Sequence, residues 1–182
     1  MGFLVAGGII LLIGVYVFST YNGFIKIRNA VEEAFSTMDV YLKKRYDLIP
    51  NLVETVKGYA KHEQETFQKI VEARAQAMNA TTIEEKQASE NVLTGTLKSL
   101  FALSENYPEL KADSQFLDLQ RQLQKVEEDI AQSRKYYNAV VKTMNTKVES
   151  FPSNIVAMLF GFKRATYFTA DETERENVQV QF

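Results

Sequence analysis

Few residues in this sequence could carry out chemistry. His62 is the only histidine among the 182 residues, and cysteine is absent from the sequence. A Ser-His-Asp triad would need partners that the pattern does not place, and a zinc or di-metal helical site needs at least two histidines. The lack of cysteine excludes disulfides, thiol nucleophiles and thiolate metal ligands. Glycine-rich phosphate-binding loops are also missing from the sequence. We therefore predict a non-enzyme with no cofactor and no metal.

His62 leaves one sharper hypothesis, a signalling or phosphorelay module. Some four-helix bundles relay phosphate through a single exposed histidine. Such modules usually have a basic residue and a glycine soon after the histidine, whereas Gln64, Glu65 and Thr66 follow here. We favour an exposed structural histidine, because a lone titratable group specifies little. Phosphorelay through His62 is kept as the alternative function.

The charge balance excludes another class of partner. The chain has 21 basic and 23 acidic residues and a formal net charge of −2. This composition creates no broad positive field of the kind that binds a phosphate backbone. We predict no nucleic-acid partner.

The first 25 residues form an uncharged stretch that predicts a membrane anchor. Phe3 to Phe18 contains eleven large apolar residues, and about 20 residues suffice to cross a bilayer as a helix. A cleaved signal peptide is disfavoured because the stretch has no basic start and no clear Ala-x-Ala site. Residues 1–25 are therefore expected to be a transmembrane signal anchor. Basic residues follow the span closely, so the positive-inside rule places the N-terminus outside and the rest in the cytoplasm.

Apolar residues in alternating steps of three and four predict the helices that follow. The first pattern restarts directly after Asn22-Gly23 and predicts one helix from the membrane to about Leu48. Pro50 predicts a turn, with Asp47 as the cap of a second helix. That second helix shows the same steps from Val53 to Ala77.

Two further helices complete the predicted bundle. Overlapping capping boxes formed by Thr81 or Thr82 with Glu84 or Glu85 predict a third helix from about Ile83. After an irregular connection at 104–114, the steps from Phe116 to Lys147 or Val148 predict a long fourth helix. The expected fold is all-α, with an N-terminal transmembrane helix continuous with an elongated antiparallel four-helix bundle over residues 26–151.

Residues 152–182 are expected to form a short apolar helix or cap and an acidic flexible tail. Ser153 or Asn154 would cap a helix that Gly161 ends. The favoured interpretation is a cap folded over the bundle end, and the alternative is a membrane or subunit contact. The candidate contact residues are Ile155, Met158, Leu159, Phe160, Phe162, Lys163, Arg164, Tyr167 and Phe168. The alternating residues 178–182 could add a strand to a partner, but a free tail is favoured.

The residues around Pro50 resemble a known family. The run 28–36, the run 38–53 with its core Asp47-Leu48-Ile49-Pro50-Asn51-Leu52-Val53, and the run 57–63 are similar to the LemA family. The resemblance extends to the anchor, Phe151–Asn154 and Tyr167-Phe168, and so covers nearly the whole chain. Phe35 stands where many relatives have tryptophan, and Tyr41 where many have glutamine; both departures concern packing.

The resemblance implies a single-pass protein of the bacterial inner membrane with a long helical bundle and no established catalytic activity. Relatives include magnetosome proteins linked to membrane formation. We therefore expect a membrane-anchored scaffold or adaptor that self-assembles and organises or shapes the membrane. Its expected partners are the lipid bilayer, further copies of the chain, and other membrane or cytoplasmic proteins.

A candidate site lies at the predicted first corner. Its residues are Asp39, Arg45, Asp47, Pro50 and Asn51. They would either cap and brace the corner or form a docking patch. We favour the structural role, because polar groups buried at a corner need partners.

Overall fold

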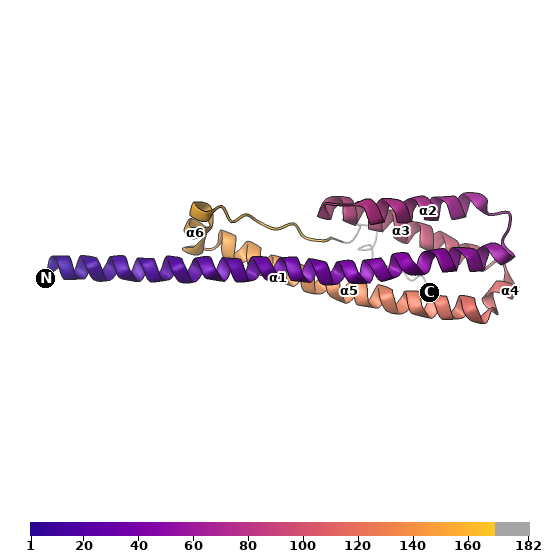
Figure 1. Cartoon of the computed structure of the whole chain (residues 1–182), viewed down its shortest axis with the longest axis horizontal. Helices are drawn as coiled ribbons and strands as arrows, with labels where there is room; N and C mark the ends of the chain where they lie inside the picture. The colour runs from indigo at the N-terminus through magenta and orange to yellow at the C-terminus, as the bar shows by residue number, and fades with distance from the viewer. Residues whose placement is uncertain (170–182) are drawn as a thin grey trace, which may run out of the picture. The chain divides into compact units, whose positions relative to one another are not determined.

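The computed structural model describes residues 1–169, and the regular elements in this range are all α-helices (Figure 1). They are α1 (Gly2–Tyr59), α2 (Gln64–Asn79), α3 (Ile83–Ser104), α4 (Pro108–Lys111), α5 (Ser114–Glu149) and α6 (Ser153–Phe160). The predicted all-α fold with a long apolar N-terminal helix is confirmed. A regular antiparallel four-helix bundle stays a prediction. The acidic and alternating parts of the predicted tail lie outside the described residues.

The chain divides into two compact units that share its two longest helices. Of the described residues, unit 1 comprises 1–38 and 133–167, and unit 2 comprises 39–132 together with Phe168 and Thr169. Helices α1 and α5 each contribute to both units. Each unit is described below by itself.

Helix α1 passes through Asn22-Gly23 without a break, as the periodic pattern predicts. The Asn22 amide donates a hydrogen bond of 3.0 Å to the carbonyl of Phe18 within the same helix. In unit 1, Phe24, Ala34 and Met38 are buried at the spacing that the pattern predicts. An asparagine-glycine pair is therefore tolerated where the flanking residues hold the helix in place.

The predicted turn at Pro50 is wrong, because α1 continues through Pro50 to Tyr59. Pro50 has no N–H, so the carbonyl of Tyr46, four residues earlier, loses its helical donor. The Nε of Arg74 in α2 donates a hydrogen bond of 2.8 Å to this carbonyl. A side chain from another helix therefore replaces the missing backbone donor. Asp47 lies inside α1 and caps no second helix.

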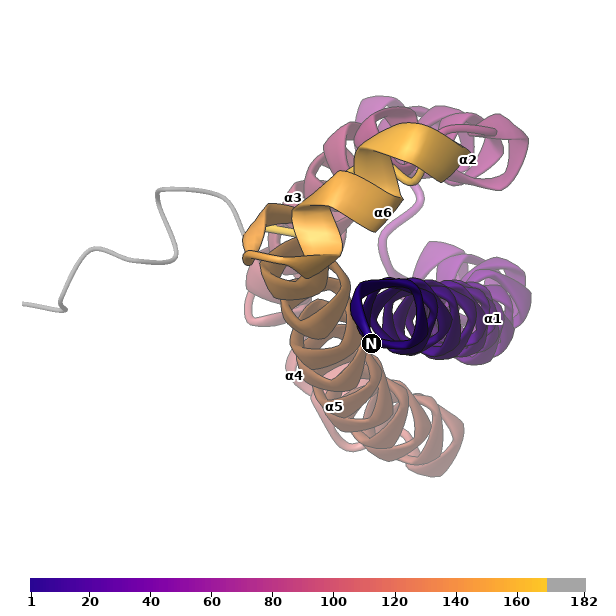
Figure 2. The ribbon, with the colours of Figure 1, turned by 90° about the vertical axis from the view of Figure 1, so that its left-hand side faces the viewer.

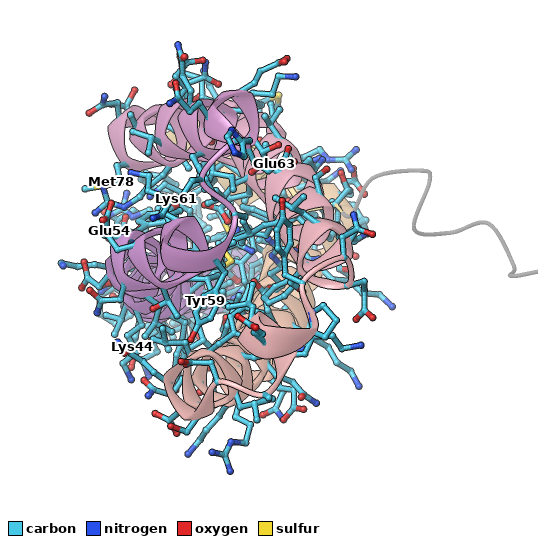
Figure 3. The ribbon with its side chains drawn as sticks, turned by 90° about the vertical axis from the view of Figure 1, so that its right-hand side faces the viewer. Lys44, Glu54, Tyr59, Lys61, Glu63 and Met78 are labelled. Atoms are coloured by element: carbon cyan, nitrogen blue, oxygen red, sulfur yellow. The ribbon has the colours of Figure 1, made fainter. Side chains whose placement is uncertain are left out.

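The chain reverses instead at residues 60–63, between α1 and α2. Figure 3 looks onto this end of unit 2, with Tyr59, Lys61 and Glu63 labelled near the reversal. The Tyr59 hydroxyl donates a hydrogen bond of 2.8 Å to Asp113, just before α5. The backbone N–H of Phe116 and then this hydroxyl lower the pKa of Asp113, and the same bond raises the pKa of Tyr59.

Helices α2 and α3 lie side by side in unit 2 and supply much of its core (Figure 1). Their buried apolar residues follow the expected steps of three and four. These residues are Phe67, Ile70, Ala73 and Ala77 in α2, and Leu93, Leu97 and Leu100 in α3. The buried residues of α3 belong to the apolar face that the sequence predicts, but Val92, also predicted on that face, is half exposed, and α2 begins only at Gln64.

Helix α3 begins at Ile83 with the predicted capping box. The Glu85 N–H donates a hydrogen bond of 3.1 Å to the Thr82 hydroxyl, and the Glu85 carboxylate accepts one of 3.2 Å from the Thr82 N–H. The backbone N–H groups of Thr81 and then Thr82 lower the pKa of Glu85. Between α3 and α5, the connection that was expected to be irregular contains the four-residue helix α4.

Replacing the cap residue gives a direct stability test. Thr82→Ala removes the acceptor for the Glu85 N–H and is expected to lower the free energy of unfolding by about 1 kcal/mol. Thr55→Ala is the matched control, because Thr55 lies inside α1, where alanine is the better helix former. Urea unfolding of the full chain in detergent, monitored by circular dichroism, measures the free energy of unfolding of both variants. Equal losses in the two variants would contradict the capping role.

The predicted ends of α5 and α6 are confirmed, whereas the predicted cap at the start of α6 is wrong. Helix α5 ends before Phe151-Pro152, and Gly161 ends α6 in the left-handed conformation with φ of 72°. No side chain caps the start of α6, where Pro152 is the N-cap. The Ser153 hydroxyl instead lies 2.7 and 2.9 Å from the carbonyl oxygens of Lys147 and Ser150. It therefore satisfies the end of α5 rather than the start of α6.

Candidate functional site

The first part of α1 exposes a long run of apolar side chains. An 18-residue window of this helix is strongly apolar, and none of it is buried within the structure. Phe3, Leu4 and Phe18 are among the most exposed large apolar residues of the described chain. Helix α1 is thus long and apolar enough to cross a membrane, by length and composition.

Aromatic contacts hold α6 and the following residues against α1 where the apolar run ends. The ring of Tyr21 lies 4.9 Å from Phe160 and 5.6 Å from Phe162, both edge to face. Phe24 stacks on Phe162 with ring centroids 4.6 Å apart. Val156 of α6 is buried in the same core cluster as Phe24. Figure 2 shows α6 across the C-terminal end of α5 and beside the first part of α1.

Within the described residues 1–169, the other side of α6 is exposed. Met158 is 77% and Leu159 68% exposed, and Ile155 and Phe160 are about half exposed. Phe151, just before the helix, is also exposed. Helix α6 therefore buries one side within unit 1 and leaves a large apolar side exposed.

The other predicted contact residues are placed differently. Phe162 and Tyr167 are partly buried, and Phe168 is buried in unit 2. Lys163 and Arg164 are exposed, and Arg164 forms an ion pair of 2.7 Å with Glu149 of α5. The predicted segment is therefore part cap and part open surface.

Basic side chains surround the stacked aromatic rings. The Lys147 ammonium lies 5.0 Å from the centroid of the Phe24 ring, in the space that a side chain on Gly23 would need. Arg28 and Lys163 line one pocket of about 170 Å³ that also includes Phe162. Cations and aromatic rings together suit the boundary between lipid and water.

A buried asparagine fixes the segment that carries Lys163 and Arg164. The Asn145 amide donates a hydrogen bond of 3.0 Å to the carbonyl of Ala165 and accepts one of 2.8 Å from its N–H. The Tyr137 hydroxyl donates a hydrogen bond of 2.8 Å to the carbonyl of Thr166. Sequence reasoning missed Asn145, although an asparagine beside Met144 on the apolar side of a helix is a signal that its side chain needs a specific partner.

In unit 2, the predicted site residue Arg45 lies at the centre of a buried ionic cluster. Its side chain and that of Glu90 are both fully buried, and the two form an ion pair. Arg45 also bonds to Glu127 at 2.8 Å and to the Thr94 hydroxyl at 3.3 Å. The Tyr46 hydroxyl donates to Glu90. Arg45 thereby joins α1 to α3 and α5.

Glu90 and Glu127 were not among the residues singled out from the sequence. Glu90 occupies an inward position of the α3 pattern, three residues before the buried Leu93. A carboxylate at such a position indicates a buried partner of opposite charge. Arg45 likewise occupies an inward position in the apolar pattern of α1. A buried cation and a buried carboxylate at such positions could have been predicted to form an ion pair.

The remaining candidate residues do not gather around Arg45. Asp39 forms an ion pair with Lys86 of α3. Asp47, Pro50 and Asn51 are exposed along α1, and Asp47 pairs with Lys43 at 2.8 Å. The predicted corner does not exist at this place, so these residues cannot brace it.

His62 lies on the exposed turn between α1 and α2. The bonds and ring contacts described above do not involve its imidazole. The His62 side chain is exposed to solvent. It belongs neither to the ionic cluster around Arg45 nor to the exposed apolar residues of unit 1.

Comparison with known proteins identifies the family. The model of the LemA family matches residues 34–182. Protein LemA of Metamycoplasma hominis is 27% identical over 178 residues, covering 94% of this chain and 80% of that protein. Magnetosome protein MamQ 2 of Paramagnetospirillum magneticum is 26% identical over 174 residues, covering 81% of this chain. The chain spans 64% of the length of that relative, and neither name is that of an enzyme. Since the family model matches far more than half of the sequence, this chain belongs to the LemA family.

Proposed function

We propose that this protein is a membrane-anchored helical scaffold that self-associates and thereby organises or shapes the membrane. One observation carries the proposal: the exposed apolar part of α1 continues, without a break, into the helix that supplies both units. A continuous helix transmits tilt or rotation better than a flexible linker does. Clustering of the anchors would therefore reorient the attached helices.

The relatives support a role at a membrane. The MamQ proteins of Paramagnetospirillum magneticum and Magnetospirillum gryphiswaldense are named as magnetosome proteins. We propose the inner membrane as the location, with the N-terminus outside and the helical units in the cytoplasm, because Lys26 and Arg28 directly follow the apolar run. The bilayer and further copies of the chain are the proposed partners.

Reconstitution of the full chain into liposomes tests the scaffold. The expected result is a set of oligomers by chemical crosslinking, together with clustered protein or altered curvature in cryo-electron micrographs. Empty liposomes from the same preparation serve as the control. A strict monomer on undeformed bilayers would contradict the proposal. Digestion of the helical units by protease added outside intact cells would contradict the orientation alone.

The exposure of His62 leaves the phosphorelay as a second candidate. It predicts that His62→Gln abolishes phosphate transfer to or from the protein while assembly stays intact. If the variant behaves like the unchanged protein in both assays, the phosphorelay is excluded and the scaffold is unaffected.

A further inference from the structure

We infer that α6 and the residues up to Arg164 form a second membrane contact, which binds an anionic phospholipid surface beside the point where α1 enters the bilayer. The inference rests on the proposed function, because it requires that α1 spans the membrane. The inference says what covers the exposed side of α6, to which the scaffold proposal assigns no partner.

The first argument is the depth of α6. At 1.5 Å per residue, the helix from Phe3 to Tyr21 rises roughly 27 Å, which is close to the thickness of the hydrocarbon core. Tyr21 therefore falls at the boundary between lipid and water, where tyrosine is favoured. Because Tyr21 contacts Phe160 at 4.9 Å, α6 lies at this same boundary.

The second argument is the open apolar side of α6. Phe151, Met158 and Leu159 are the most exposed large apolar residues in this part of unit 1. Helix α6 has eight residues, about 12 Å of helix, with Val156 and Ala157 buried on its other side. An interfacial helix inserts such a side into the boundary of headgroups and acyl chains.

The third argument is charge. Lys26 is exposed just after the apolar run, and Arg28 and Lys163 line one pocket beside the half-buried Phe162. Arg164 is partly neutralised by Glu149, so these three cations carry the electrostatic attraction. Phosphate groups of anionic lipids complement them in the plane where Tyr21 places α6.

A second copy of the chain is the competing occupant. A stable protein interface buries about 800 Å² on each partner, whereas the open side of α6 comes from one eight-residue helix and Phe151. Phe160 of α6 contacts Tyr21 at the end of the apolar part of α1, so a bilayer that takes up this part would also cover the open side of α6 without a further partner. These considerations favour lipid.

Tryptophan fluorescence can test the contact, because the sequence contains no tryptophan. Leu159→Trp in the full chain is reconstituted into phosphatidylcholine–phosphatidylglycerol vesicles with brominated acyl chains. We expect its emission to fall by about twofold or more relative to unbrominated vesicles. Tyr136→Trp is the matched control in unit 1. Tyr136 is exposed, and its neighbour Tyr137 contacts Phe35, roughly 21 Å along α1 from Tyr21. Its emission should not fall.

Leu12→Trp separates failure of the inference from failure of the anchor. If Leu12→Trp is quenched and Leu159→Trp is not, α1 spans the bilayer and the inference is overturned. If neither is quenched, the proposed membrane anchor itself fails. Quenching of both and not of Tyr136→Trp supports the inference.

Two further variants test charge and the competing occupant. Lys163→Glu in the Leu159→Trp chain should reduce quenching in anionic vesicles, whereas Lys135→Glu, an exposed lysine of α5, should leave it unchanged. The sequence also lacks cysteine, so Met158→Cys reports contact between copies. Efficient disulfide dimers of Met158→Cys, without lipid quenching at Leu159→Trp, would show that a second copy covers α6.

Discussion

Arg45→Met is expected to lower the free energy of unfolding by about 3–5 kcal/mol. The Arg45 side chain is fully buried and pairs with Glu90, whose side chain is also fully buried. Removing the cation takes the Arg45 charge away from a buried carboxylate, and this loss costs far more than the apolar replacement gains. Glu127 is affected less, because its side chain is 40% exposed and can turn to water.

The double variant Arg45→Met with Glu90→Met tests the cause of this loss. When both members of a buried ion pair are replaced by apolar residues, stability often returns to that of the original protein or exceeds it. We therefore expect the double variant to recover most of the loss. Lys43→Met is the matched control, because the Lys43–Asp47 pair is exposed on the same helix and is expected to contribute at most about 1 kcal/mol.

Chemical unfolding of the full chain in detergent, with fluorescence and circular dichroism as two probes, measures these differences. A loss in Arg45→Met no larger than that in Lys43→Met would show that the cluster does not brace unit 2. A double variant that is no more stable than the single variant would show that Arg45 acts through contacts other than Glu90.

Arg74→Leu is expected to lower the free energy of unfolding by about 1–3 kcal/mol, because it removes the donor to the Tyr46 carbonyl. Pro50 causes this dependence, since it supplies no N–H for that carbonyl. In a Pro50→Ala background the alanine N–H can donate instead. The loss on Arg74→Leu should then shrink by about 1–2 kcal/mol.

A double-mutant cycle on Arg74 and Pro50, measured by urea unfolding, tests this coupling directly. Arg121→Leu is the matched control, because Arg121 is an exposed arginine of α5 in unit 2. It should show neither a large loss nor coupling to Pro50. Additive effects of Arg74→Leu and Pro50→Ala would contradict the exchange of donors.

The error at Pro50 shows where prediction from the sequence stops. Proline in a helix interior usually ends or bends the helix, and the flanking Asp47 and Asn51 are typical of turns and caps. The helix continues because α2 brings Arg74 to the orphaned carbonyl. Twenty-eight residues separate Arg74 from Tyr46, so no pattern in the local sequence reports the contact.

The sequence predicted some residues of the candidate sites and not others, because contacts between distant parts of the chain leave no local pattern. Arg45 is among the polar residues of the predicted corner that match the LemA family, yet its partners Glu90 and Glu127 lie on other helices. The apolar character of residues 155–160 was visible in the sequence. Which of these residues face the protein and which stay open depends on the packing of Phe162 against Phe24 and on the Asn145–Ala165 hydrogen bonds.

The sequence alone determined the apolar helix at the N-terminus, the all-α fold, the start of α3 at its capping box, the end of α6 at Gly161 and the resemblance to the LemA family. These features follow from periodicity, caps and motifs, whose interactions join residues within a turn or two of each other. Only the tertiary structure decided that α1 continues through Pro50, that Arg45 pairs with Glu90, and that Met158 and Leu159 remain exposed while Phe160 contacts Tyr21. The physical reason is that a buried charge or an orphaned carbonyl takes its partner from whatever packs against it, and this partner comes from a distant part of the chain.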